Sequence, residues 1–116
     1  MSEITVYHNP RCSNSRGVLE ILRAAGLEHE VIEYLDTPPS KATLTALLAV
    51  MGLSARELLR AKETVYVELD LGKAAWTAEE LINFMVAYPV LINRPIVVTP
   101  KGVRLCRPPE VVHEIL

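Results

Sequence analysis

The chain has few of the residues that bind metals or form disulfide frameworks. Only two of its 116 residues are cysteine, and three are histidine. Two cysteines cannot build a disulfide framework, and they are too few for a four-ligand zinc site unless histidines help. His8, His29 and His113 are widely separated in the sequence and show no ligand spacing. We therefore expect no metal and no bound cofactor.

Long apolar runs and an excess of basic charge are also missing. No apolar run reaches the roughly 18 residues of a membrane-spanning helix, and Met1-Ser2-Glu3 does not begin the basic-then-apolar layout of a signal peptide. The 12 Lys and Arg residues are balanced by 14 Asp and Glu residues. This balance lacks the basic footprint of a nucleic-acid-binding protein. We expect a cytoplasmic protein that binds neither membranes nor nucleic acids.

The composition is that of one globular domain. Half of the residues are hydrophobic and 22% are charged, and we find no repeat, linker or low-complexity segment. We expect a single domain over residues 1–116. Each apolar stripe in the sequence is needed for one core, so we also expect a monomer.

The first part of the chain predicts a β-α-β unit. Alternating apolar residues favour strands over 3–7 and 29–34. Between them, apolar residues at helical spacing favour a helix from Ser13 to Ala25, followed by Gly26 at the C-cap. A helix of this length joins two parallel strands by a right-handed crossover.

The middle of the chain is predicted to be helical, and the end to be a hairpin followed by a helix. A helix is expected over 40–51, and two capping boxes, at Ser54–Glu57 and Thr77–Glu80, open further helices. Residues 61–73 are expected to be irregular. Strands are expected over 96–98 and 103–106, and a terminal helix from Pro109 to Leu116.

This order predicts an α/β fold of the thioredoxin-like class. A βαβ piece and a ββα piece are separated by a helical insertion, and a cysteine stands at the first strand-to-helix turn. Pro95 precedes the third strand directly, and it is the candidate for a cis peptide bond.

Cys12 is the candidate nucleophile. It lies between Arg11 and Ser13, directly before the first helix, where unpaired amide donors and the helix dipole lower a thiol pKa. No cysteine follows two residues later, so an external thiol must resolve any intermediate. Cys106 lies in a predicted strand, and we expect a structural role for it.

The same helix start predicts an oxyanion site. Amide groups from Ser13 to Arg16 can converge on an anion, and Ser13, Asn14 and Ser15 add polar donors. Ser13 and Asn14 are equally typical of ordinary helix caps.

Three arginines are further candidates for holding an oxyanion, because the planar guanidinium matches its geometry. Arg94 and Arg107 stand beside prolines at the ends of the hairpin, and Arg60 closes a short helix. The alternatives are surface ion pairs for Arg94 and Arg107 and a dipole contact for Arg60.

Three separated motifs together resemble the ArsC family, the glutaredoxin-linked arsenate reductases. They are Tyr7-His8-Asn9-Pro10-Arg11-Cys12-Ser13-Asn14-Ser15-Arg16, Leu91-Ile92-Asn93-Arg94-Pro95-Ile96-Val97 and Leu105-Cys106-Arg107-Pro108.

This resemblance implies reduction of arsenate to arsenite by Cys12 through a covalent adduct, with glutathione as co-substrate and glutaredoxin as partner. It also implies that Arg60, Arg94 and Arg107 bind the oxyanion, and that His8 helps to lower the thiol pKa. Two alternatives are a glutathione-dependent thiol transferase and an Spx-like transcriptional regulator that binds RNA polymerase. The regulators generally carry Cys-x-x-Cys, which Ser15 interrupts here.

Overall fold

The structure is a computed structural model that describes residues 3–116, and these form two compact units. The first unit combines the segment up to Thr37 with Arg94–Leu116, and the second is Pro38–Asn93. The elements of the first unit are β1 (Thr5–His8), α1 (Ser13–Ala24), β2 (Glu30–Glu33), β3 (Ile96–Thr99), β4 (Gly102–Leu105) and the 3-10 helix η2 (Pro109–Ile115).

The first unit is built on a four-stranded sheet in the order β2-β1-β3-β4. Strand β1 pairs in parallel with β2, with Val6 opposite Val31, and antiparallel with β3, with Val6 opposite Val97. Strand β4 pairs antiparallel with β3 as a hairpin. The parallel pair requires the crossover through α1, and the hairpin needs only the turn at residues 100–101. This is the thioredoxin-like arrangement predicted from the sequence.

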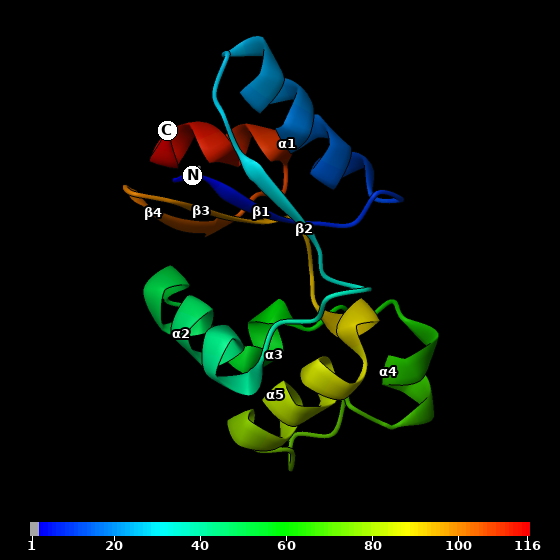
Figure 1. Ribbon diagram of the computed structural model, residues 1–116. Coiled ribbons are helices and arrows are strands. Elements are labelled where there is room, and N and C mark those ends of the chain that lie inside the picture. The colour runs from blue at the N-terminus through cyan, green and yellow to red at the C-terminus, as the bar shows by residue number, and fades with distance from the viewer. Residues whose placement is uncertain (1–2) are drawn as a thin grey trace. The chain divides into compact units, whose positions relative to one another are not determined.

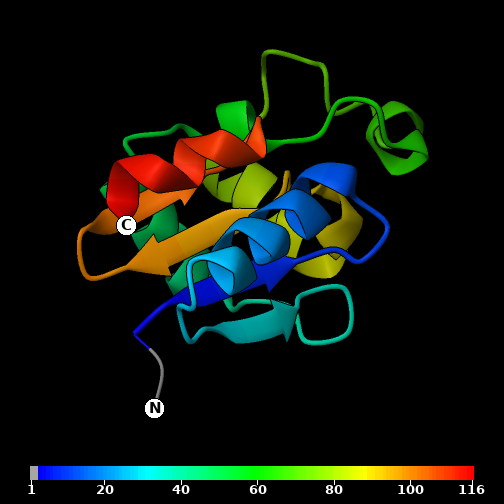
Figure 2. The ribbon, with the colours of Figure 1, turned by 90° about the horizontal axis from the view of Figure 1, so that it is seen from above.

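Helices α1 and η2 pack side by side on one face of this sheet (Figures 1 and 2). Their contact requires a glycine, because a Cβ atom at Gly17 would lie 2.7 Å from Cγ of Pro109. Apolar burial between the helices and the sheet stabilises the unit. The core beneath the helices consists of Ile4, Val6, Val18, Leu19, Leu22, Val97, Cys106, Val112 and Ile115.

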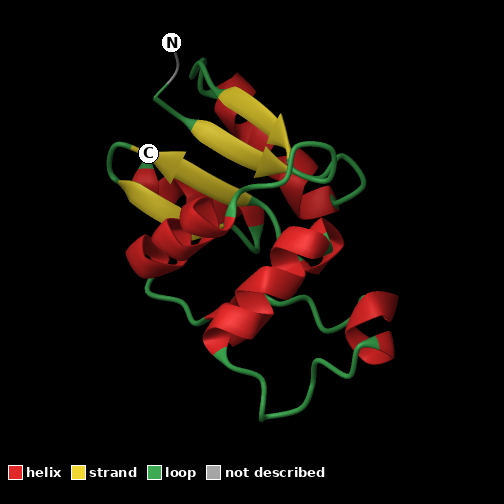
Figure 3. Cartoon of the chain, turned by 60° about the horizontal axis from the view of Figure 1, so that its bottom comes forward, coloured by secondary structure: helices red, strands yellow, loops and turns green. Residues whose placement is uncertain are grey.

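The second unit contains helices and loops (Figure 3). Helix α5 packs against α2, α3 and η1. A backbone bridge between Leu59 and Ile92 joins the end of α3 to the segment that leaves the unit. The helices are α2 (Lys41–Met51), α3 (Ala55–Leu58), α4 (Thr64–Glu68), α5 (Ala78–Ala87) and the 3-10 helix η1 (Pro89–Leu91).

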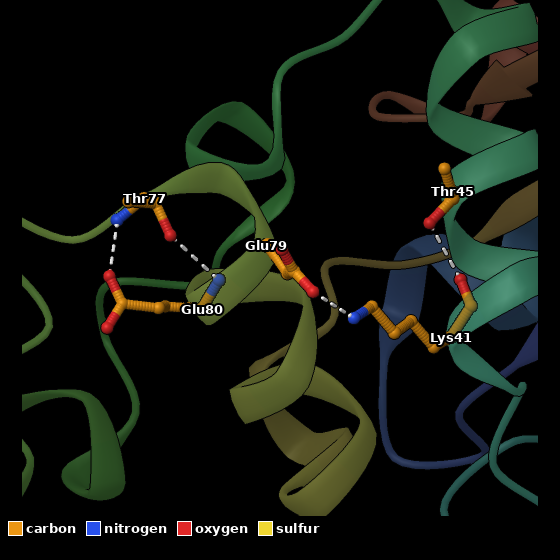
Figure 4. A network of polar contacts seen from close by, with 5 residues as sticks. All are labelled: Lys41, Thr45, Thr77, Glu79 and Glu80. Atoms are coloured by element: carbon orange, nitrogen blue, oxygen red, sulfur yellow. Dashed lines mark hydrogen bonds and ion pairs between the residues drawn. The ribbon is translucent and has the colours of Figure 1, made fainter.

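Local capping residues fix where these helices begin and where α2 ends. Ser54 and Thr77 form the two expected capping boxes, each with the glutamate three residues later, and Gly52 ends α2 in the left-handed conformation. Figure 4 shows the box of Thr77 and Glu80 beside an ion pair in which Lys41 of α2 reaches Glu79 of α5 at 2.6 Å. Both partners of that pair are exposed, so we assign it little stability.

Two parts of the secondary structure differ from the prediction. Residues 61–73 contain α4, although Thr64, Val65 and Val67 are β-branched and poor helix formers. Non-local contacts support this segment, since the Arg56 guanidinium donates to the carbonyl oxygens of Leu71 and Lys73 at 2.9 Å.

The terminal helix is of the 3-10 type. Its first bond runs from the N–H of Val111 to the carbonyl of Pro108, three residues back, at 3.1 Å. Among residues 3–116, no helix is both long and apolar enough to cross a lipid bilayer.

Candidate active site

Cys12 occupies the N-cap of α1, at the end of a tight loop after β1. Its backbone N–H donates to the carbonyl of Asn9 at 3.0 Å, and its own carbonyl accepts from the N–H of Arg16 at 3.0 Å. The backbone at Cys12 is extended, with φ −91° and ψ 122°, as is usual for an N-cap residue. The loop therefore presents the sulfur to the first amide groups of the helix.

The surroundings of Cys12 favour its thiolate. The residue is 9% exposed, and burial raises the pKa of the thiol. The backbone N–H of Ser15, the Arg94 side chain, the backbone N–H of Asn14 and the Ser15 hydroxyl lower it more strongly, and the resulting pKa is about 7. About half of the thiol is thus ionised near neutral pH, where an ordinary cysteine is mostly protonated.

Two arginines from distant parts of the chain meet at this sulfur. Nη1 of Arg107 lies 3.6 Å from Sγ of Cys12 and also donates to the carbonyl of Arg94 at 2.9 Å. Arg94 is 8% exposed, and its side chain hydrogen-bonds the sulfur. The sulfur therefore has two guanidinium groups beside it, and such groups hold oxyanions well.

Both arginines precede a proline in a cis peptide bond, Arg94–Pro95 and Arg107–Pro108. Pro95 is the candidate that the sequence suggested. The second cis bond, at Pro108, was not predicted, because nothing in the local pattern distinguishes it from an ordinary helix-preceding proline.

The sequence pattern missed two buried residues of the site, Asn9 and Tyr34. Asn9 is 3% exposed; its N–H donates to Oγ of Ser15 at 3.4 Å, and its Oδ1 accepts from the N–H of Arg11 at 2.9 Å. Tyr34, which directly follows β2, hydrogen-bonds the side chains of Asn9 and Arg94. The sequence patterns place Asn9 only within the first motif of the family resemblance and Tyr34 only at the end of the strand expected over 29–34.

His8 is buried at the end of β1. Burial lowers its pKa, Glu33 opposes this shift, and Arg23 and Arg16 add to it, so the imidazole is neutral at pH 7. Its Nδ1 has no hydrogen-bond partner among the described residues. The groups identified at the Cys12 sulfur do not include His8, and its effect on the thiol stays a prediction.

The remaining predicted site residues lie in different settings. Ser13 is exposed at the first position of α1, and the Arg16 guanidinium donates to the carbonyl of Pro10 at 2.9 Å. Arg60 belongs to the second unit, where its Nε donates to Oε2 of Glu63 at 2.8 Å. The oxyanion-binding roles of these residues stay predictions.

Cys106 has the opposite environment to Cys12. It is fully buried in the core of the first unit, and its Sγ lies 3.7 Å from the carbonyl oxygen of Arg104. Burial and the charge of Glu114 raise the pKa of this thiol to about 12, against a smaller lowering by Arg104. Cys106 is thus protonated and inaccessible at neutral pH.

The fold and the site define a class of protein. It has a thioredoxin-like sheet with one reactive cysteine at the start of α1, where helix amides and two arginines can hold an anion beside a nucleophilic thiolate. The model of the ArsC family matches residues 7–115. The chain belongs to the ArsC family.

Individual relatives agree with this assignment. The chain is 55% identical over 116 residues to the arsenate reductase of Escherichia coli (strain K12), covering all of this chain and 82% of that protein. It is 50% identical over 115 residues to the uncharacterized protein YfgD of the same strain, covering 98% and 97% of the two chains. The solved structure of an arsenate reductase from Vibrio cholerae superposes with a TM-score of 0.93 at 44% identity, with 97% of each chain covered.

Proposed function

We propose that this protein is a cytoplasmic arsenate reductase that converts arsenate to arsenite with glutathione as co-substrate and glutaredoxin as partner. The observation that carries the proposal is the Cys12 thiol, with a pKa of about 7 and both Arg94 and Arg107 at its sulfur. Family membership and the similarity to arsenate reductases support the choice of substrate.

The first step is attack of the Cys12 thiolate on arsenic. A bond forms between Sγ and arsenic, one arsenic–oxygen bond breaks, and that oxygen leaves as water after protonation. Arsenate carries ~2 negative charges near neutrality, and the arginines and the α1 amides offset this charge as it is redistributed. Removing one such donor typically costs ~10²-fold in rate.

The second step transfers electrons to arsenic. The glutathione thiolate attacks Sγ of Cys12, the sulfur–arsenic bond breaks, and its electron pair stays on arsenic, which is reduced from As(V) to As(III). Arsenite leaves, and Cys12 remains in a mixed disulfide with glutathione. A glutaredoxin thiol then attacks the glutathione sulfur and restores the Cys12 thiol. This sequence uses one cysteine of the chain, in agreement with the inert surroundings of Cys106.

The test is arsenate-dependent oxidation of NADPH in an assay coupled through glutathione, glutathione reductase and glutaredoxin. We expect turnover by the native protein that requires arsenate and glutaredoxin and is absent in Cys12→Ser. Turnover on glutathione mixed disulfides without any response to arsenate would contradict the proposal and favour a thiol transferase. Arsenate reduction by Cys12→Ser would contradict the role of the thiolate.

A further inference from the structure

Tyr34 is a buried polar residue without a role in the reaction described above. It directly follows β2, and only 1% of its surface is exposed. A tyrosine this deeply buried needs partners for its hydroxyl group, because an unsatisfied buried hydroxyl costs free energy. Here two of those partners belong to the active site.

The hydroxyl of Tyr34 hydrogen-bonds the side chains of Asn9 and Arg94. Oδ1 of Asn9 accepts from the N–H of Arg11, which leaves the amide NH₂ to donate to Tyr34. Burial raises the pKa of the Tyr34 hydroxyl, so the group is neutral. Because a guanidinium can only donate, the Tyr34 oxygen is the acceptor in the hydrogen bond with Arg94.

Arg94 therefore connects the tyrosine to the nucleophile. Its side chain hydrogen-bonds both the Tyr34 hydroxyl and the Cys12 sulfur, while its carbonyl accepts from Arg107. An arginine side chain has many rotamers, and fixing one of them near an anion has an entropic cost. A buried hydroxyl that accepts from the guanidinium reduces the number of orientations that remain.

We propose that Tyr34 is a positioning residue that holds the Arg94 guanidinium against the Cys12 sulfur. The tyrosine does not contact the reacting atoms; it acts through Arg94, with Asn9 fixing the tyrosine in turn. The part of this inference that concerns arsenate rests on the proposed function, and the part that concerns the thiol does not.

The first test compares Tyr34→Phe with the native protein. The variant keeps the buried ring and removes only the hydroxyl. Without that acceptor Arg94 stabilises the thiolate less well, so we expect the pKa of Cys12 to rise by about half a unit to one unit. The rate of alkylation by iodoacetamide as a function of pH measures this shift. Tyr7→Phe, in β1, is the matched control and should leave the midpoint unchanged.

A double-mutant cycle separates positioning from a general structural effect. In an Arg94→Ala background, Tyr34→Phe should produce no further rise in the thiol pKa, because the residue through which it acts is gone. An equal shift in both backgrounds, or no shift in either, would overturn the proposal. This readout does not depend on arsenate, so it stands even if the protein fails to reduce arsenate.

Steady-state kinetics and NMR give two further readouts. We expect Tyr34→Phe to raise KM for arsenate about 3- to 10-fold at pH 9, where Cys12 is ionised in native and variant alike. In the native protein, ¹⁵N NMR should show separate Nη resonances for Arg94, because its rotation is hindered, and averaged ones for the exposed Arg11. Averaged resonances for Arg94 would contradict the proposal without requiring that any variant folds.

Discussion

The two cysteines of this chain are both buried, yet their chemistry differs. Cys12 has a thiol pKa of about 7, and Cys106 one of about 12. Both lie in the first unit, and burial acts on both thiols in the same direction. The difference is in the donors: Cys12 faces amide N–H groups and two guanidinium groups, whereas Sγ of Cys106 lies beside a carbonyl oxygen.

This comparison shows that burial alone does not decide whether a thiol is reactive. Burial raises the pKa of both groups by disfavouring the charged form. At Cys12 the donors at the start of α1 and the Arg94 side chain reverse that effect, and at Cys106 the nearby Glu114 adds to it. The donors at the start of α1, together with Arg94, therefore separate the nucleophile from the core cysteine in this fold.

The largest expected difference in turnover is between removing the Cys12 thiol and removing the Cys106 thiol. Cys12→Ser should lower arsenate turnover by at least about 10³-fold, since the hydroxyl is a far weaker nucleophile at neutral pH. Cys106→Ala should retain turnover within about 2-fold, if it folds, because Cys106 takes no part in the reaction. The coupled NADPH assay measures both. Equal losses in the two variants would break the comparison.

A smaller effect on turnover is expected from replacing the arginine beside Cys12, and the arginine near Cys106 supplies the control. Arg107→Ala removes a donor at Cys12 and should lower kcat/KM for arsenate by about 10²-fold. Arg107→Lys should recover only part of the loss, because an ammonium lacks the planar fork. Arg104→Ala is the control, since Arg104 lies near Cys106 and pairs with Glu114 at 3.6 Å. Comparable losses for Arg104→Ala would point to damage to the hairpin rather than to the site.

The smallest effect is on stability, where substitution of Cys106 should cost more free energy of unfolding than substitution of Cys12. Cys106→Ser places a hydroxyl in an apolar core and should lower the free energy of unfolding by about 1 to 3 kcal/mol. Cys12→Ser should cost little at pH 6, because serine is a favoured N-cap residue.

The choice of pH follows from the sign of the thiol shift. The pKa of Cys12 is lower in the folded protein than its ordinary value, so the thiolate stabilises the fold at higher pH and this contribution is lost as the pH falls through about 7. Urea unfolding at pH 6 therefore compares the two substitutions without the thiolate. A larger loss for Cys12→Ser than for Cys106→Ser would contradict the account.

Much of the fold could be predicted from local sequence patterns. The period-two segments, the capping boxes and the glycines after α1 and α2 specify elements whose observed ends fall within two residues of the predicted ones. Helix α4 could not be predicted this way, because its support comes from Arg56, outside the segment.

The candidate site was predictable only in part, for the same reason. Cys12, Arg94 and Arg107 stand out locally, because each lies in a loop beside a strand end and next to residues that interrupt regular structure. Tyr34 and Asn9 belong to the site through contacts between β1, β2 and Arg94, and such contacts depend on strand pairing. Apolar periodicity assigns such residues to a strand or a turn and carries no information about their partners.

The most direct test of the central claim is a titration of the Cys12 thiol in the native protein. Thiolate absorbance at 240 nm, or the rate of alkylation, should rise with pH around a midpoint near 7, and mass spectrometry should place the modification on Cys12 with Cys106 unmodified until the protein unfolds. A midpoint near 8.5, the value of an unperturbed cysteine, would contradict the claim that the start of α1 and Arg94 create the nucleophile.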